Sequence, residues 1–349
     1  MNARLPVGIL GATGTVGQEF IAALATHPWF EVAWIAASER SAGKAYADAT
    51  PWRLPSPRPD EVARMVVRRC TPEDAPALVF SGLDASAAGE VEAAFAAAGH
   101  TVVSNARNYR MAPDVPLLIP EINPDHLRLL DVQSRVRGWT GRVVTNPNCS
   151  TIVMTLALAP LRPFGLTRVM VSTLQAVSGA GYPGVASLDI TGNVLPHIRG
   201  EEDKMETEAR KILGSFDHGA VTEHPVVVSA QTTRVPVVNG HMMLVSAELD
   251  GSPSEADLVD AFRQFGGRPQ DEDLPTAPGQ PLFYTDDPNR PQPRLDVDRD
   301  GGMAVTVGRL RPCPVLDYKF VALGHNTVRG AAGAAILNAE LMKVDGLLA

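Results

Sequence analysis

Residues 11–17 read Gly-Ala-Thr-Gly-Thr-Val-Gly and follow directly on a short apolar run, Leu5 to Leu10. The run is typical of a buried strand, and the apolar residues from Val16 to Leu24 then recur at helical spacing. Glycines at such a turn permit a tight bend, a close approach of the backbone to a pyrophosphate and close packing of helix on strand. The stretch therefore predicts the first unit of a Rossmann-type, dinucleotide-binding domain.

The pattern continues as alternating strands and helices. Extended runs at residues 31–36, 77–81 and 101–104 surround the alanine-rich helical segment 86–98. Such alternation is typical of parallel β-α-β units with right-handed crossovers. Residues 1–148 are therefore predicted to form a doubly wound parallel sheet. The helical spacing of residues 328–343 indicates a last helix, and we expect residues 325–349 to complete this first domain.

The chain changes character after residue 148. Its extended segments, at 167–177, 226–238, 242–250 and 303–311, are β-branched and partly alternating. They predict a largely antiparallel sheet with one packed face, in an α+β catalytic domain over residues 149–324. Helices are expected at residues 150–161, 184–192, 203–213 and 254–265. Residues 269–300 contain seven prolines and eight acidic residues, so we expect an exposed connection with no core element.

Composition excludes several classes of protein. The formal net charge of −8 argues against binding along a nucleic-acid backbone. No apolar run approaches the roughly 18 residues of a membrane helix, and no leader pattern is seen, so we expect neither membrane insertion nor secretion. The three cysteines show no C-x-x-C spacing, which argues against a disulfide framework and a metal site. The cytoplasm is the expected compartment.

The cofactor loop and the tip of the second strand together indicate which dinucleotide binds. We expect the cofactor to lie against Gly11, Thr13, Gly14, Thr15 and Val16. An NAD site would place an acid at the strand tip, whereas here Glu39 is surrounded by hydroxyl groups and cations. Arginine and serine suit the 2′-phosphate of NADP, which favours NADP(H). The contacts expected at the tip are Ser38, Arg40 and Ser41.

One cysteine has a special place. Asn146-Pro147-Asn148 separates a strand from an apolar helix, and Cys149 stands at the first turn of that helix. The helix dipole and the free N–H groups there should lower the pKa of its thiol, and the same N–H groups suit a developing oxyanion. Cys149 is therefore predicted to be a nucleophile. Cys70 and Cys313 are interpreted as ordinary thiols.

Seven segments in order resemble the aspartate-semialdehyde dehydrogenase family, in its archaeal and fungal branch. The segments are Gly-Ala-Thr-Gly-Thr-Val-Gly (11–17), Ser-Asn-Ala-Arg-Asn-Tyr-Arg-Met (104–111), Asn-Pro-Asn-Cys-Ser-Thr (146–151), Gln-Ala-Val-Ser-Gly-Ala-Gly (175–181), Gly-Glu-Glu-Asp-Lys (200–204), Arg-Val-Pro-Val-Val-Asn-Gly-His (234–241) and Gly-His-Asn-Thr-Val-Arg-Gly-Ala-Ala (324–332). The resemblance implies NADPH-dependent conversion of L-aspartyl-4-phosphate to the semialdehyde with release of inorganic phosphate. It also implies a homodimer or a dimer of dimers, paired through the second domain.

The resemblance further implies roles for individual residues. His241 would be the general acid and base, and Gln175 would orient the substrate at the Cys149 thiol. Arg234 would bind the substrate carboxylate and Glu201 its ammonium group, with Glu202 as the competing choice for Glu201. Lys204, Arg110 and Asn148 would hold phosphate, with Arg107 as the competing choice for Arg110. The nicotinamide half of the cofactor would lie near Ser178, Gly179 and Asn326.

Related chemistries stay open as alternatives. N-acetylglutamyl-phosphate reductases resemble this chain but usually read Gly-Cys-Tyr where it reads Asn-Cys-Ser, and the Cys-Thr-Thr-Asn-Cys of glyceraldehyde-3-phosphate dehydrogenases is absent. A malonyl-CoA reductase of the same fold would keep the cysteine, the histidine and NADPH. A nucleotide-binding protein without catalysis would not need the thiol and the histidine, and a zinc dehydrogenase would need a ligand cluster.

Overall fold

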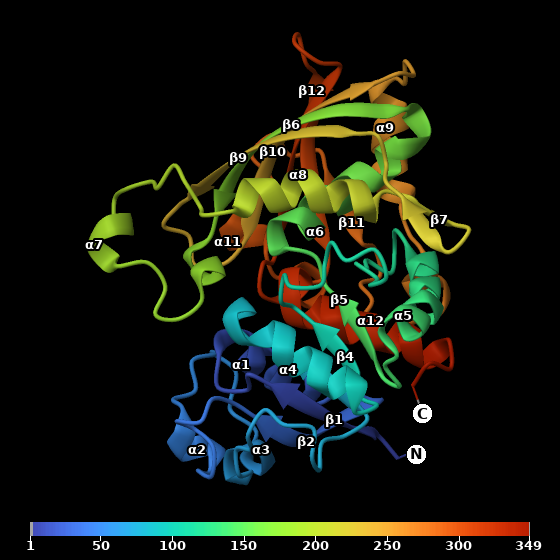
Figure 1. The fold of residues 1–349 in the computed structure, drawn as a ribbon. Coiled ribbons are helices and arrows are strands. Elements are labelled where there is room, and N and C mark those ends of the chain that lie inside the picture. Colours follow the sequence, from blue (N-terminus) through green and yellow to red (C-terminus); the bar gives the residue numbers. More distant parts are fainter. Residues whose placement is uncertain (1–2, 349) are drawn as a thin grey trace.

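The computed structural model describes residues 3–348, and its first sheet is fully parallel (Figure 1). The five strands lie in the order β2-β1-β3-β4-β5 and all four pairings are parallel. They span Leu5–Leu10 (β1), Phe30–Ala36 (β2), Leu78–Ser81 (β3), Thr101–Ser104 (β4) and Arg142–Thr145 (β5). The connecting helices are α1 (Thr15–Leu24), α2 (Tyr46–Ala49), α3 (Asp60–Arg64), α4 (Ala85–Ala97) and α5 (Leu129–Arg137). The predicted doubly wound sheet is confirmed.

The strand order reverses beside β1. The chain leaves β1 for β2 on one side and then crosses to β3 on the other. Ligands of open α/β sheets bind at the carboxyl ends of the strands at such a switch point. The loop after β1 lies there, and its glycines are required by the packing. Gly11 has a φ of +75°, and a Cβ on Gly17 would lie 2.3 Å from the Gly11 carbonyl oxygen.

The second sheet has six strands in the order β11-β12-β13-β10-β6-β9. They span Leu166–Gln175 (β6), Val227–Arg234 (β9), His241–Leu249 (β10), Leu282–Thr285 (β11), Val305–Pro312 (β12) and Tyr318–Gly324 (β13). The three inner pairings are antiparallel, while β9 on β6 and β11 on β12 are parallel. The sheet is therefore mixed, with the predicted antiparallel character confined to its centre.

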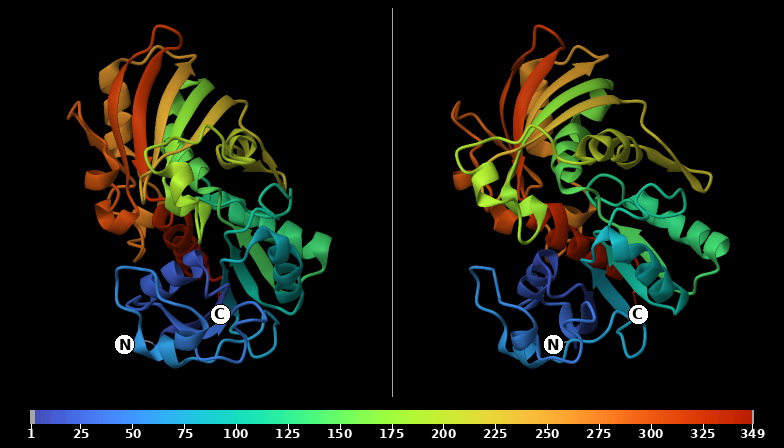
Figure 2. Two further views of the ribbon diagram at one scale, coloured as in Figure 1. Left: turned by 90° about the vertical axis from the view of Figure 1, so that its left-hand side faces the viewer. Right: turned by 60° about the vertical axis from the view of Figure 1, so that its left-hand side comes forward.

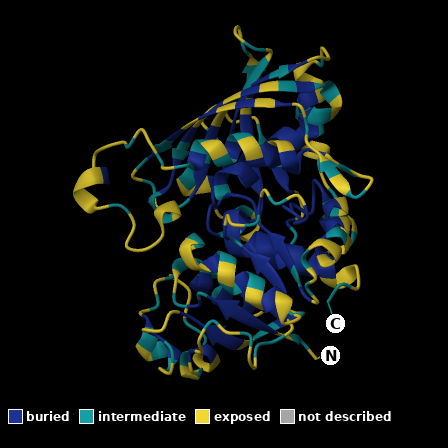
Figure 3. Cartoon of the chain, in the orientation of Figure 1, coloured by how far each residue is buried: buried dark blue, intermediate teal, exposed yellow. Residues whose placement is uncertain are grey.

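Helices cover one face of this sheet and leave the other open (Figures 1 and 2). The covering helices are α6 (Cys149–Leu158), α8 (Glu201–Ile212) and α9 (Glu255–Gln264). Buried and exposed positions alternate along the strands of this sheet (Figure 3). On β6, Val169 and Val171 are buried while Met170 is 54 % exposed. Residues 150–158 are all buried, so α6 passes from the end of β5 into the core of the second domain.

Two expectations about the second domain are wrong, and several of its strands were missed. Residues 269–300 are not an exposed connection, because they form α10 (Arg268–Asp271), β11 and α11 (Pro293–Asp296). Leu274 and Leu282 in this segment are buried. The helix expected at 184–192 shrinks to α7 (Ser187–Ile190), within a mostly exposed excursion between Gly181 and Gly200. The strands β11 and β13, and the hairpin of β7 (Ser215–Asp217) and β8 (Ala220–Thr222), were not predicted.

The end of the chain returns to the first domain (Figure 1). A π-helical turn, Val328–Ala332, leads into α12 (Gly333–Val344). Residues of α12 share one apolar core with β1 and α1. Residues 1, 2 and 349, the outer ends of the predicted first domain, lie outside the described residues. Within residues 3–348, no helix is long and apolar enough to cross a membrane.

Candidate active site

Cys149 is the first residue of α6, at the junction of the two domains. Asn148 caps the helix, because its side-chain oxygen accepts hydrogen bonds from the backbone N–H groups of Ser150 (3.0 Å) and Thr151 (3.2 Å). The cap orients the helix start and leaves its positive end at the thiol. Cys149 itself is only partly buried.

The π-helical turn packs directly on this cysteine. A Cβ on Gly330 would lie 2.6 Å from the Cys149 Cβ and 3.1 Å from its Cα, so glycine is required for the contact. The neighbouring Arg329 is fully buried and donates two hydrogen bonds to the Glu121 carboxylate, at 2.8 and 2.7 Å. This bidentate ion pair fixes the turn that supports the nucleophile. Single π-helical turns often occur at functional sites.

Gly330→Ala is therefore predicted to displace the Cys149 backbone. We expect a fall in kcat of at least about tenfold and a loss of stability of about 1–3 kcal/mol, as for other overpacked sites. Gly266→Ala is the matched control, since a Cβ at Gly266 would meet no atom within 4 Å. Steady-state kinetics and thermal unfolding of both variants measure the effect, and unchanged turnover in Gly330→Ala would contradict the proposed packing.

Glu201 brings a carboxylate beside the nucleophile. Its oxygens accept hydrogen bonds from Asn148 Nδ2 (3.0 and 3.1 Å), Ser150 Oγ (2.9 Å) and Lys204 Nζ (3.1 Å). Burial alone would raise its pKa, but Lys204 and these hydrogen bonds hold the pKa below its usual value. Glu202 points elsewhere and accepts a hydrogen bond from the Thr232 backbone. The structure therefore places Glu201, and not Glu202, beside Cys149.

A second buried acid, Glu208, links Arg110 to the nucleophile loop. One of its oxygens accepts from Arg110 (2.9 Å) and the other from the Asn148 backbone N–H (2.7 Å). Arg107, the competing choice, is exposed. The sequence analysis missed Glu208, although a signal was present. It follows Glu201 by seven residues, which places the two on the same face of α8.

The ends of β6, β9 and β10 supply three more predicted residues. Gln175 and Arg234 are paired at the ends of β6 and β9, and both are buried. Arg234 Nη1 donates a 2.8 Å hydrogen bond to the Ala176 carbonyl oxygen. His241 opens β10, and its Nδ1 accepts from the Ala176 N–H at 3.2 Å. A neutral His241 ring therefore carries its proton on Nε2, which has no hydrogen-bond partner among residues 3–348.

The loop after β6 closes on these side chains. A Cβ on Gly179 would lie 2.8 Å from Arg234 Nη1 and 3.1 Å from His241 Nε2, so a larger residue would have to displace these two side chains. Asn326 connects this loop to the turn before β10. It donates to Ser178 Oγ (2.8 Å) and accepts from the Gly240 N–H (2.9 Å). The predicted residues Ser178, Gly179 and Asn326 thus lie together beside His241.

The surroundings of the Cys149 thiol raise its pKa, whereas the sequence analysis expected a lowered pKa. The loss of water around the Cys149 thiol, which is the largest effect, and the Glu201 carboxylate both raise its pKa, whereas Arg110, Lys204 and Arg234 lower it. The net pKa is about 12. The expected lowering of this pKa by the helix start is therefore wrong. Burial likewise lowers the pKa of His241 to about 3, so its imidazole is neutral near pH 7.

Glu201→Gln should make the Cys149 thiol more reactive toward alkylation but should lower the rate of catalytic turnover. Removing the neighbouring charge lowers the Cys149 pKa, so alkylation by iodoacetamide at pH 8 should accelerate by about tenfold. Glu202→Gln, whose carboxylate faces β9, is the matched control. Mass spectrometry of the Cys149 peptide measures the rate apart from Cys70 and Cys313. Equal rates in Glu201→Gln and the unaltered chain would refute the electrostatic argument.

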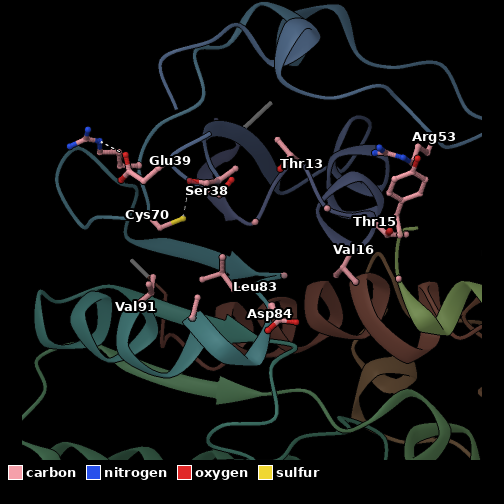
Figure 4. Close-up of a pocket in the computed structure, with 18 of the residues that line it drawn as sticks. Thr13, Thr15, Val16, Ser38, Glu39, Arg53, Cys70, Leu83, Asp84 and Val91 are labelled. Atoms are coloured by element: carbon pink, nitrogen blue, oxygen red, sulfur yellow. Dashed lines mark hydrogen bonds and ion pairs between the residues drawn. The ribbon is translucent and has the colours of Figure 1, made fainter. Parts of the chain in front are cut away.

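A cavity of about 850 Å³ opens at the switch point of the first sheet (Figure 4). Its wall includes the loop after β1, the tips of β2 and β3, the start of α4 and the loop after β6. Gly14 caps α1 there, so the N–H groups of that helix face the cavity region. The predicted residues in its wall are Gly11, Thr13, Gly14, Thr15, Val16, Ser38 and Gly179. The cavity volume and the helix start fit a dinucleotide.

Four predicted cofactor residues are not in this wall: Arg40 and Ser41, which lie in a tight turn after Ser38, and Ser178 and Asn326 near His241. Other wall residues were not predicted, among them Arg53, Arg69, Thr71 and Tyr182. Arg53 lies over the Tyr182 ring at 3.9 Å and joins the first domain to the excursion after β6. Among residues 3–348, no three His, Cys, Asp or Glu side chains are grouped to hold a metal ion.

Comparison with known proteins agrees with both the cofactor cavity of the first domain and the nucleophile site of the second. Residues 6–130 match the family model "Semialdehyde dehydrogenase, NAD binding domain", and residues 158–329 match "Semialdehyde dehydrogenase, dimerisation domain". Aspartate-semialdehyde dehydrogenases of Archaeoglobus fulgidus and Cryptococcus neoformans are 51 % and 50 % identical to this chain. The alignments cover 97 % and 99 % of it and 98 % of each relative.

Solved structures show the same likeness. The Candida albicans aspartate-semialdehyde dehydrogenase with NADP superposes with a TM-score of 0.91 at 41 % identity, over 99 % of this chain and 100 % of that one. A Vibrio cholerae aspartate-semialdehyde dehydrogenase II complexed with ASA gives 0.77 at 25 % identity, over 99 % of both chains. The nucleophile loop, the flanking charges and these likenesses lead to one conclusion: the chain belongs to the aspartate-semialdehyde dehydrogenase family.

Proposed function

We propose that this chain reduces L-aspartyl-4-phosphate to L-aspartate 4-semialdehyde with NADPH and releases inorganic phosphate, a step in lysine, threonine and methionine biosynthesis. One observation carries the proposal. A thiol at a helix start lies among one carboxylate, Glu201, and three cations, Arg110, Lys204 and Arg234. This set matches an amino-acid substrate with an ammonium group, a carboxylate and an added phosphate.

The proposed recognition divides these charges among the substrate groups. Arg234 binds the α-carboxylate with its planar guanidinium, and Glu201 binds the ammonium group. Lys204, Arg110 and Asn148 bind the phosphate. A substrate ammonium at Glu201 also offsets the negative charge that raises the Cys149 pKa, so binding itself favours the thiolate. Gln175, at the end of β6, orients the reacting carbonyl.

The first chemical step forms a bond from Cys149 Sγ to the acyl carbon and breaks the bond from that carbon to the phosphate oxygen. Phosphate leaves with the electron pair and takes up the proton that the Cys149 thiol loses, and the enzyme is left as a thioester. NADPH supplies the hydride when bound. The tetrahedral oxyanion on the substrate carbon then accepts a hydrogen bond from His241 Nε2–H, the buried donor without a protein partner. Collapse releases the aldehyde, and His241 relays the proton that returns to the thiolate.

The proposed cofactor contacts follow the cavity wall. Gly11, Thr13, Gly14, Thr15 and Val16 would hold the pyrophosphate at the start of α1, and Ser38 would lie at the adenosine ribose. Gly179, Ser178 and Asn326 would flank the nicotinamide, beside His241.

Malonyl-CoA reduction is the remaining alternative, and a direct comparison of substrates tests it. Malonyl-CoA brings no ammonium group to Glu201, which leaves a buried carboxylate without its substrate partner. We therefore expect kcat/KM for aspartyl phosphate to exceed that for malonyl-CoA by at least about 10³-fold. NADPH oxidation at 340 nm follows both reactions. A preference for the thioester would overturn the proposed substrate.

We also propose a homodimer, with the first domain formed by residues 1–148 and 325–349 and the catalytic domain by 149–324. The open face of the second sheet supports the proposal, because the apolar side chains of Met170, Leu244 and Val227 are exposed on it. A mass of twice 37.1 kDa by light scattering is the expected result. The three free cysteines agree with a reducing cytoplasm as the proposed compartment.

A further inference from the structure

We propose that Lys211 is a positioning residue for the phosphate of the substrate, because it anchors the loop that carries Arg110. The inference rests on the proposed function, in which Arg110 binds that phosphate, and extends it to a residue that acts through Arg110. Lys211 lies in the last turn of α8 and is only 4 % exposed. A buried ammonium group is costly unless its donors are satisfied, so the partners of Lys211 bear on what it does.

The Lys211 ammonium group donates to three backbone carbonyl oxygens of the loop that follows β4. Its Nζ lies 2.7 Å from the Arg110 oxygen, 2.7 Å from that of Ala112 and 2.8 Å from that of Val115. An ammonium group has three protons, so each carbonyl can receive one. Lys211 therefore holds residues 110–115 against the end of α8, and one of its three hydrogen bonds is made to Arg110 itself.

The side chain of Arg110 is held by the same helix. Glu208, which precedes Lys211 by three residues on α8, accepts a 2.9 Å hydrogen bond from Arg110 Nη1. Its other oxygen accepts from the Asn148 N–H beside the nucleophile at 2.7 Å. The buried Nε donor of Arg110 has no partner among residues 3–348, which agrees with a ligand oxygen as the missing partner. Lys211 and Glu208 thus hold Arg110 by its backbone and by its guanidinium.

Loss of the Lys211 donors would leave three carbonyl oxygens of one loop without these hydrogen bonds. Unpaired buried carbonyls draw the backbone toward other partners, so the loop and the guanidinium of Arg110 would shift. The residues proposed for the substrate carboxylate and carbonyl, Arg234 and Gln175, stand on β9 and β6, and their positions should not depend on this loop. The effect should therefore fall on phosphate and spare the amino-acid part of the substrate.

The test is the reverse reaction, in which phosphate and L-aspartate 4-semialdehyde are separate substrates with separate KM values. Lys211→Met nearly keeps the length of the side chain but removes its three donors. It should raise the KM for phosphate at least about tenfold and leave the KM for the semialdehyde within about twofold. NADPH formation at 340 nm measures both values, and thermal unfolding shows that the variant is folded.

Arg162→Met is the matched control, because Arg162 Nη1 also donates to a backbone carbonyl beside the end of α8, that of Leu213, at 3.2 Å. It removes a cationic donor from the same region without touching residues 110–115, and both KM values should stay within about twofold. Lys211→Gln keeps an amide donor and decides the matter if Lys211→Met does not fold. It should raise the KM for phosphate several-fold.

Other outcomes would overturn the inference. An equal rise of both KM values in the Lys211 variants, or the same rise for phosphate in Arg162→Met, would show a merely structural role. The unaltered chain separates this inference from the proposed function. If it oxidises the semialdehyde with no dependence on phosphate, the proposed function fails. Normal phosphate dependence together with an unchanged KM for phosphate in folded Lys211 variants refutes the role of Lys211 alone.

Discussion

Replacing Cys149 with serine should lower kcat by at least about 10⁴-fold, the largest effect expected of any single substitution in this chain. The hydroxyl keeps the place of the thiol at the start of α6, but it is a far weaker nucleophile and a poorer leaving group. Because Cys149 lies outside the cavity wall at the first sheet, NADPH should bind with an unchanged Kd. Quenching of protein fluorescence measures that Kd, and NADPH oxidation measures kcat.

Cys313→Ser is the control for this prediction. Cys313 contacts Ser246 on the second sheet and lies outside the residues that act on the thiol of Cys149. Its substitution should leave turnover within about twofold. Substantial activity in Cys149→Ser, or a similar loss in Cys313→Ser, would refute the covalent mechanism assigned to Cys149.

His241→Asn should lower kcat by about 10²–10⁴-fold with a smaller change in KM. The buried Nε2–H is the proposed donor to the oxyanion, and an asparagine amide does not reach the same position. The effect belongs to a step after substrate binding, so NADPH affinity should stay the same. Full kinetics in both directions of the reaction measure the split between kcat and KM.

His218→Asn provides the matched control, because His218 lies in the exposed turn between β7 and β8. It should keep full activity. A rise in KM alone for His241→Asn would assign the histidine to substrate binding and contradict its role in proton transfer.

The sequence predicted those strands and helices whose pattern of apolar residues is visible within a short segment. The change from strand to helical period at residues 11–17 is visible in the sequence and defines the first sheet. The strand β13 was missed because it lies between β10 and β12 and is buried toward its end, so its residues do not alternate. The strand β11 has only four residues among prolines, and it forms because β12 offers a paired edge.

The site shows the same division. Motifs predicted Cys149, Glu201 and His241, and the structure brings Glu201 to each of the other two. The raised pKa of Cys149 depends on burial and on a carboxylate 52 positions later in the chain, which no local pattern reveals. Arg69 reaches the tip of β2 only through the bridge between Ala36 and Arg68. The features that the sequence analysis missed therefore depend on contacts between segments that lie far apart in the chain.

The covalent intermediate offers the most direct measurement. The enzyme is mixed with L-aspartate 4-semialdehyde and NADP in the absence of phosphate, and NADPH formation and the mass of the Cys149 peptide are followed. We predict a burst of about one NADPH per chain, an aspartyl adduct on Cys149, and steady turnover only after phosphate is added. Sustained turnover without phosphate, or a burst with no adduct on Cys149, would contradict the account.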